Sequence, residues 1–150
     1  MARRNVTHDR STQALTRTLK RCVRFEEIDA MGVMWHGRYA SWLEDGREDL
    51  GRHFGISYLD FYAKNVIVPL RTLNLDFLAP LKYPNSYTLE TSLLWSDAAI
   101  LEFSYIIRSE EQIHCKAYSL QMMLTTDYVL LLDVPIFFQD FKQKWQQGML

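Results

Sequence analysis

The sequence predicts an α+β fold in which an antiparallel five- to six-stranded sheet wraps around a central helix, with another helix at the C-terminus. Three observations lead to this fold class. An amphipathic helical pattern occurs early, over residues 36–53. A run of strand-like segments joined by short connections follows it. Strands and helices do not alternate, so a parallel sheet is not indicated.

The composition fits one globular domain with a substantial core. Of the 150 residues, 48% are hydrophobic and 23% are charged. No stretch approaches the ~18 apolar residues of a transmembrane helix, and the N-terminus lacks the apolar segment of a secretory signal. Cys22 and Cys115 lie in strand-like surroundings, so we expect buried, reduced thiols. These features predict a cytoplasmic protein without membrane insertion.

Charge is distributed unevenly along the chain. Residues 1–24 hold seven of the 17 Lys and Arg residues and a single acid, Asp9. We expect residues 1–14 to form a flexible basic tail and residues 15–150 to form the domain. A basic head can bind nucleic acid or attract an anionic substrate. No nucleic-acid recognition motif accompanies this one, so we expect no nucleic-acid partner.

The first strand and the central helix follow the tail. Loosely alternating apolar residues predict a strand over 15–25, which leads into a turn around Asp29. The helix at 36–53 has apolar residues at helical spacing on one face and charged residues, including Arg47, on the other. Gly46 lies on the apolar face despite its low helix propensity, which indicates that the sheet approaches the helix closely.

The second half of the chain contains most of the strand-like segments. A β-rich run at 66–78 is interrupted by Pro69, and a proline-containing bend spans 79–85. Three strands and a final helix are predicted at 87–95, 100–108, 113–125 and 135–147. A sheet that covers one helix leaves a face and edges without partners. We therefore expect a homodimer or homotetramer.

The most informative stretch runs from Glu26 to Arg52. It places a carboxylate, Asp29, on a turn next to Gly32, and then Trp35 and His36 directly before the helix. The start of a helix has free backbone N–H groups and a partial positive charge, which both favour negative charge. A carboxylate beside such a backbone suits acyl transfer.

This stretch resembles the signature of the hot-dog-fold acyl-CoA thioesterases, in the branch of 4-hydroxybenzoyl-CoA thioesterase and the tol-pal-associated thioesterases. The matching positions are Phe25, Glu27, Asp29, Gly32, Trp35, His36, Tyr39, Trp42, Leu43, Glu44 and Arg47. Weaker similarity extends over most of the chain after about residue 18. Ala30-Met31, Gly46 and the segment after residue 110 depart from the family pattern, so the resemblance leaves the acyl group open.

The resemblance implies a hot-dog fold, hydrolysis of an acyl-CoA thioester and active sites between paired subunits. The family's catalytic carboxylate falls at Asp29, either as nucleophile forming an acyl-enzyme anhydride or as general base for a water. Backbone N–H groups around Trp35, His36 and Gly37 are candidates to hold the oxyanion. The His36 side chain is expected to orient substrate or water. By residue type alone, Asp29 is also a common turn former.

The remaining signature residues are candidates for substrate binding. They are Gly32, Trp35, Tyr39 and Glu44, of which Tyr39 also belongs to the core. Glu44 contacts either the site or subunit interface, or only its neighbours on the helix flank. The aromatic-rich stretch 56–64 forms either ordinary core or one wall of an acyl pocket. The number of aromatic residues favours an aromatic or short- to medium-chain acyl group.

We expect no metal and no cofactor apart from the CoA of the substrate. The four histidines do not form a ligand cluster, and the sequence has neither a phosphate-binding glycine loop nor a serine nucleophile elbow. Phosphates of CoA would meet scattered bases, for which Arg24, Arg71 and Lys82 are candidates.

Two other functions are compatible with the same residues. The first is hydrolysis of an acyl-carrier-protein thioester, and the second is a non-catalytic acyl-ligand-binding or assembly module on this scaffold. A hydratase of the same fold is less favoured, because its Asp and His lie closer in sequence than Asp29 and His36.

Overall fold

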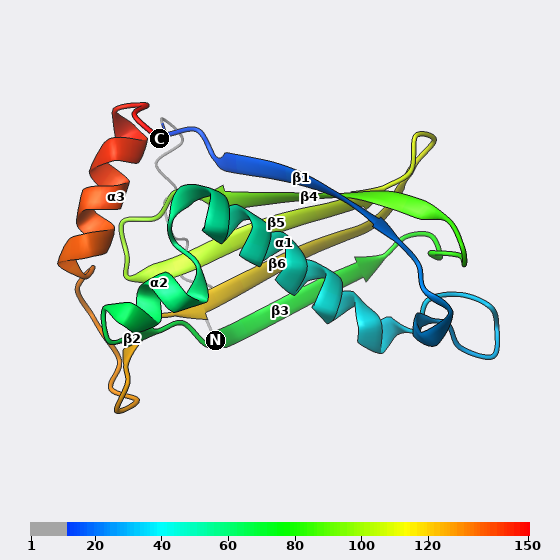
Figure 1. The fold of residues 1–150 in the computed structure, drawn as a ribbon, viewed down its shortest axis with the longest axis horizontal. Coiled ribbons are helices and arrows are strands. Elements are labelled where there is room, and N and C mark those ends of the chain that lie inside the picture. The colour runs from blue at the N-terminus through cyan, green and yellow to red at the C-terminus, as the bar shows by residue number, and fades with distance from the viewer. Residues whose placement is uncertain (1–11) are drawn as a thin grey trace, which may run out of the picture.

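The computed structural model describes residues 12–150, in which a curved antiparallel sheet lies against one long helix (Figure 1). The strand order is β1-β4-β5-β6-β3. The strands are β1 (Leu15–Cys22), β3 (Leu70–Phe77), β4 (Ser86–Leu94), β5 (Ile100–Arg108) and β6 (Ile113–Met122). The predicted α+β class with an antiparallel sheet around a helix is confirmed. The predicted tail lies almost entirely outside the described residues.

Two predicted strands were too long. The strand predicted over 15–25 ends at Cys22, and a short 3-10 helix at Phe25–Glu27 then turns the chain. The strand predicted over 113–125 divides into β6 and β7 (Leu124–Thr125). β7 pairs with β2 (Val66–Ile67) in a separate two-stranded sheet. Pro69 separates β2 from β3, in agreement with the predicted interruption.

Three α-helices complete the fold. α1 (Tyr39–Phe54) follows a 3-10 turn at His36–Arg38 and ends at Gly55, whose φ of 74° suits glycine. α2 (Tyr58–Ala63) and α3 (Ile136–Gln146) pack at the end of the sheet opposite the loop of residues 28–36 (Figure 1). Among the described helices, none combines the length and the apolar character required to cross a membrane.

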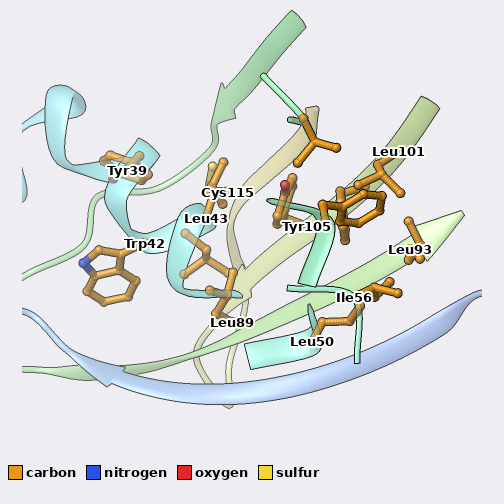
Figure 2. Packing of buried hydrophobic residues seen from close by; sticks show 14 of the residues in the cluster. Tyr39, Trp42, Leu43, Leu50, Ile56, Leu89, Leu93, Leu101, Tyr105 and Cys115 are labelled. Carbon is orange, nitrogen blue, oxygen red and sulfur yellow. The ribbon is translucent and has the colours of Figure 1, made fainter. Parts of the chain in front are cut away.

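The core lies between α1 and the sheet. Leu43 and Leu50 of α1 belong to the same buried cluster as Leu89 and Leu93 of β4 (Figure 2). Gly46 faces this contact, and a Cβ atom there would lie 2.2 Å from Thr91 Oγ1. The helix therefore approaches β4 as closely as predicted, and only glycine fits the space at this position.

Arg47 lies in the core, contrary to the prediction that it belongs to the charged face of α1. Only 6% of the residue is exposed. Its Nε donates to the Tyr58 hydroxyl (3.2 Å) and one terminal nitrogen donates to the Tyr105 hydroxyl (3.0 Å). Burial alone lowers the pKa of Arg47, but contacts with Tyr105 and Tyr58 outweigh it and raise the pKa above its usual value. Neutral hydroxyl groups thus solvate a buried cation.

The prediction of buried thiols is correct for one of the two cysteines and wrong for the other. Cys115 is buried, and burial raises its pKa to about 11. Cys22 is exposed, with Sγ 3.0 Å from the Pro84 carbonyl oxygen. β1 is an edge strand in which exposed and partly buried residues alternate, and Cys22 falls on the exposed side. Both thiols are free.

Candidate active site

Asp29 opens a tight turn between two short paired segments. The Asp29 N–H donates to the Val33 carbonyl (2.9 Å), and the Gly32 N–H donates to the Asp29 carbonyl (3.0 Å). Gly32 has a φ of +78°, which is costly for other residues. Asp29 Oδ1 accepts a hydrogen bond from the Met31 N–H (2.8 Å). This local bond is that of a turn former, and it uses one of the two carboxylate oxygens.

The turn is attached to a distant part of the chain. Val33 forms a β-bridge with Lys82, and the Met34 N–H donates to the Leu81 carbonyl (2.7 Å). The Trp35 N–H donates back to the Glu27 carbonyl (2.9 Å). The chain then enters the 3-10 turn and α1. These bonds place Asp29 close to the N-terminal end of the helix.

A cavity of about 320 Å³ lies between this turn and the segment after β3. Asp29, His36 and Tyr39 all line it. The other lining residues are largely apolar: Met31, Val33, Met34, Phe77, Leu78, Ala79 and Pro80. A carboxylate and an imidazole thus share a mostly apolar space with the first residue of α1.

Tyr39 closes the inner side of this cavity. It is 3% exposed, and its ring meets Phe77 edge-on at a centroid separation of 4.8 Å. Burial raises the pKa of Tyr39 to about 12, so its hydroxyl stays neutral and acts as a hydrogen-bonding group. Tyr39 therefore belongs to the core, as predicted, and also lines the cavity. Its role in substrate binding stays a prediction.

The other predicted site residues do not line the cavity; they are Gly32, Trp35, Gly37 and Glu44. The Trp35 ring covers Gly37 so closely that a Cβ on Gly37 would lie 2.2 Å from the ring. As helix-opening residues, His36 and Gly37 have N–H groups without an intrahelical acceptor, and neither donates elsewhere within residues 12–150. Gly32 shapes the turn, and Glu44 is an exposed residue of α1. The role of each residue remains a prediction.

The aromatic stretch 56–64 does not contribute to this cavity. Phe61 is fully buried against Phe137 and Phe138 of α3, while Leu59 and Tyr62 point to solvent with 78% and 62% exposure. The interpretation as ordinary core packing is therefore correct for Phe61. None of these residues lines the cavity beside Asp29, because α2 packs at the other end of the sheet. A role of this stretch in an acyl pocket stays a prediction.

Comparison with known proteins identifies the family. The family model described as the thioesterase-like superfamily matches residues 23–141, which include the Asp29 turn, α1 and the whole sheet except β1. The chain belongs to this thioesterase-like superfamily.

Individual relatives agree with the thioesterase-like family. YneP of Bacillus subtilis, provisionally named an acyl-CoA thioesterase, is 35% identical over 69 residues, which cover 46% of this chain and 50% of YneP. The acyl-CoA thioester hydrolase YbgC of Escherichia coli O157:H7 is 26% identical over 89 residues, covering 59% and 66% of the two chains. The matches thus span about half of the first relative and about two thirds of the second.

Solved structures extend the likeness to the whole fold. The DHNA-CoA thioesterase of Staphylococcus aureus superimposes with a TM-score of 0.78 at 24% identity, covering 89% of this chain and 90% of that one. The 1,4-dihydroxy-2-naphthoyl-CoA thioesterase Slr0204 of Synechocystis superimposes with a TM-score of 0.75 at 17% identity, covering 89% of this chain and 97% of that one. The hot-dog fold implied by the sequence resemblance is confirmed.

Sequence reasoning missed the opposite wall of the thioesterase-like cavity. Phe77, Leu78, Ala79 and Pro80 face Asp29 from a segment about fifty residues further along the chain. The proline-containing bend predicted at 79–85 is the sequence feature next to this wall, and it indicates only where β3 ends. Nothing in the local pattern showed that this bend lies against the Asp29 turn.

A larger cavity, of about 670 Å³, lies behind this wall. Lys20, Lys82, Glu110 and Glu111 line it together with the buried His114. The two lysines are offset by two glutamates, and the Asp29 carboxylate is absent from the lining. The smaller cavity, which Asp29 lines, is therefore the candidate active site. Within the described residues, no group of three or more His, Cys, Asp or Glu side chains is arranged to hold a metal ion.

Proposed function

We propose that this protein is an acyl-CoA thioesterase that hydrolyses an aromatic or short- to medium-chain acyl thioester to the free acid and CoA. The observation that carries the proposal is the shared cavity of Asp29, His36 and Tyr39 at the start of α1. Membership of the thioesterase-like superfamily supports the same activity. Two relatives that act on thioesters by name, YbgC and YneP, support it further.

The apolar lining suits the acyl part of such a substrate. Met34, Phe77 and Leu78 surround the space next to the Asp29 carboxylate, and burial of an acyl group there gains about 25 cal/mol per Å² of apolar surface. The structures named for dihydroxynaphthoyl-CoA substrates support an aromatic acyl group in this fold. The cavity of about 320 Å³ is at the lower end of the usual range for ligand pockets.

In the proposed reaction, the thioester carbonyl lies beside Asp29 and its oxygen accepts hydrogen bonds from the N–H groups of His36 and Gly37. These donors stabilise the oxyanion of the tetrahedral intermediate. As general base, Asp29 takes a proton from a water that attacks the carbonyl carbon. As nucleophile, an Asp29 oxygen attacks instead, the CoA thiolate leaves, and water then hydrolyses the anhydride.

The decisive experiment measures thiol release from a panel of acyl-CoA and acyl-carrier-protein thioesters by the wild type and Asp29→Asn. Asparagine retains the Oδ1 atom that accepts the Met31 N–H bond, so the turn is expected to persist. Loss of the carboxylate should reduce kcat at least about 100-fold. The matched control is Asp127→Asn, an exposed turn residue, for which we expect the wild-type rate.

The outcomes separate the candidate functions. Equal rates for wild type and Asp29→Asn would remove Asp29 from the mechanism. Turnover of carrier-protein thioesters alone would make the carrier protein the physiological thiol. Absence of turnover with every thioester would favour a non-catalytic binding or assembly module. In oxygen-18 water, label that appears in the Asp29 carboxylate identifies the anhydride route.

We further propose that the protein works in the cytoplasm as a homodimer or homotetramer, without a cofactor of its own. Three large hydrophobic residues that line the cavity are exposed: Met31 (80%), Phe77 (52%) and Leu78 (56%). Their apolar surface gains stability when a second copy covers it. Sedimentation of the purified protein tests the assembly.

A further inference from the structure

One residue of β6, His114, holds the wall of the Asp29 cavity from behind. Its carbonyl oxygen accepts hydrogen bonds from the Leu78 N–H (2.9 Å) and the Ala79 N–H (3.0 Å). Its ring Nδ1 lies 3.0 Å from the Pro80 carbonyl oxygen. Three consecutive residues of the wall therefore bind to the same histidine, although His114 itself does not line the cavity.

The partners of the ring decide where its proton lies. The Pro80 carbonyl can only accept a hydrogen bond, so Nδ1 carries the proton and donates it. On the other side of the ring, Nε2 lies 2.9 Å from the Ser109 hydroxyl. Tyr87 packs edge-on against the ring at 4.8 Å between centroids. The imidazole is thus held in one orientation.

The wall needs this support because the sheet no longer provides it. β3 ends at Phe77, so Leu78, Ala79 and Pro80 have no strand partners beyond the bonds to His114 among the described residues. The cavity of about 670 Å³ lies on the far side, where Pro80 and His114 both line it. A wall released from His114 has space into which it can move.

We propose that His114 is a positioning residue that sets where the Leu78–Pro80 wall stands, and therefore which acyl groups fit beside Asp29. This inference rests on the proposed thioesterase function. The wall faces the carboxylate across the cavity, so its displacement changes the width available to the acyl group. Bulky and slender acyl groups respond differently to such a change.

The test compares His114→Phe with Ser109→Ala. Phenylalanine preserves a ring against Tyr87 but removes the donor to Pro80. Ser109→Ala keeps that donor and removes the bond on the outer side of the ring, together with the bonds of the Ser109 hydroxyl to Gln112. We expect the ratio of kcat/KM for an aromatic over a linear acyl-CoA to change roughly fivefold in His114→Phe, the value of one net hydrogen bond. In Ser109→Ala the ratio should stay within about twofold.

His114→Asn tests whether another side-chain donor at position 114 restores the wild-type ratio of kcat/KM values. Its side-chain amide N–H occupies the place of Nδ1–H and can donate to Pro80, so the ratio should return toward that of the wild type. A histidine that merely stabilises the fold would lower kcat/KM by the same factor for every substrate. An unchanged ratio in His114→Phe would therefore overturn the proposal.

A second measurement needs no substrate. The Leu78 and Ala79 amides bond to the backbone carbonyl of residue 114, which His114→Phe retains, so their hydrogen exchange reports whether loss of the side-chain bond to Pro80 loosens the whole wall. The proposal expects this exchange to become roughly fivefold faster in His114→Phe and to remain at the wild-type rate in Ser109→Ala. Unchanged exchange in His114→Phe would also overturn the proposal. If the wild type hydrolyses no thioester, the proposed function fails, while these exchange rates still decide whether His114 holds the wall.

Discussion

The indole N–H of Trp42 donates to Oε2 of Glu27 across 2.8 Å, and both residues are buried. The other carboxylate oxygen of Glu27 accepts the Arg24 backbone N–H at 2.9 Å. The first turn of α1 is therefore tied to the turn that precedes Asp29. Glu27 belongs to the signature of the sequence, and its contacts show that it supports the candidate catalytic turn from inside the fold.

Glu27→Gln should destabilise the fold by about 1–3 kcal/mol, because the amide offers only one acceptor oxygen for two donors. Urea unfolding measures the loss. The control is Glu26→Gln, whose exposed carboxylate pairs with Arg24 and should change the free energy of unfolding by less than about 1 kcal/mol. An equal decrease in the free energy of unfolding for both variants would show that the buried contacts of Glu27 do not stabilise the fold more than a surface ion pair does.

Gly46→Ala should destabilise the protein, because its Cβ would lie 2.2 Å from Thr91 Oγ1. Overpacking of this kind costs about 1–3 kcal/mol, of which the better helix propensity of alanine returns up to about 1 kcal/mol. Thr91→Ala removes the obstructing hydroxyl. We expect Gly46→Ala to cost at least about 1 kcal/mol less in that background, measured by a double-mutant cycle. An equal cost in both backgrounds would contradict the proposed contact.

The same helix shows what the sequence could predict about the fold. Its extent, the burial of Trp42 and Leu43 and the close approach at Gly46 all follow from periodicity and residue size. Arg47 could not be placed by these rules, because an arginine on a helix is usually exposed. Its burial depends on Tyr58 and Tyr105, which lie 11 and 58 residues away and supply the hydrogen bonds.

Arg47→Met should lower the free energy of unfolding by about 1–3 kcal/mol, since the Tyr58 and Tyr105 hydroxyls lose a buried donor. Thermal and urea unfolding measure the effect. Arg52→Met is the matched control, because this arginine is largely exposed on the same helix and should change stability by less than about 0.5 kcal/mol. A loss in Arg47→Met no larger than in the control would contradict a structural role for the buried cation.

Stability should fall at alkaline pH. Burial raises the pKa of Tyr39 from 10.0 to about 12, so the unfolded chain loses this proton first. The contribution of the neutral hydroxyl is present below pH 10 and is lost as the pH rises toward 12. Tyr39→Phe has no such proton, and its free energy of unfolding should decline less steeply over this range. Tyr62→Phe, an exposed control, should keep the wild-type slope.

The sequence pattern predicted only part of the candidate site. The signature located Asp29, His36 and Tyr39, which do share one cavity. The wall at Leu78–Pro80 and its histidine support remained hidden, because they arise from pairing between residues distant in sequence. Local patterns identify reactive groups, whereas the shape of the space around them depends on how strands are brought together.

The bridge between Val33 and Lys82 has a consequence for how the cavity forms during folding. A fragment that ends after α1 contains every signature residue but neither the Lys82 bridge nor the apolar wall. Such a fragment should have no thioesterase activity, and mixing it with the remaining half of the chain should restore the activity. We therefore expect the cavity to form only when the sheet closes, so that a newly made chain gains activity only after its second half has been synthesised.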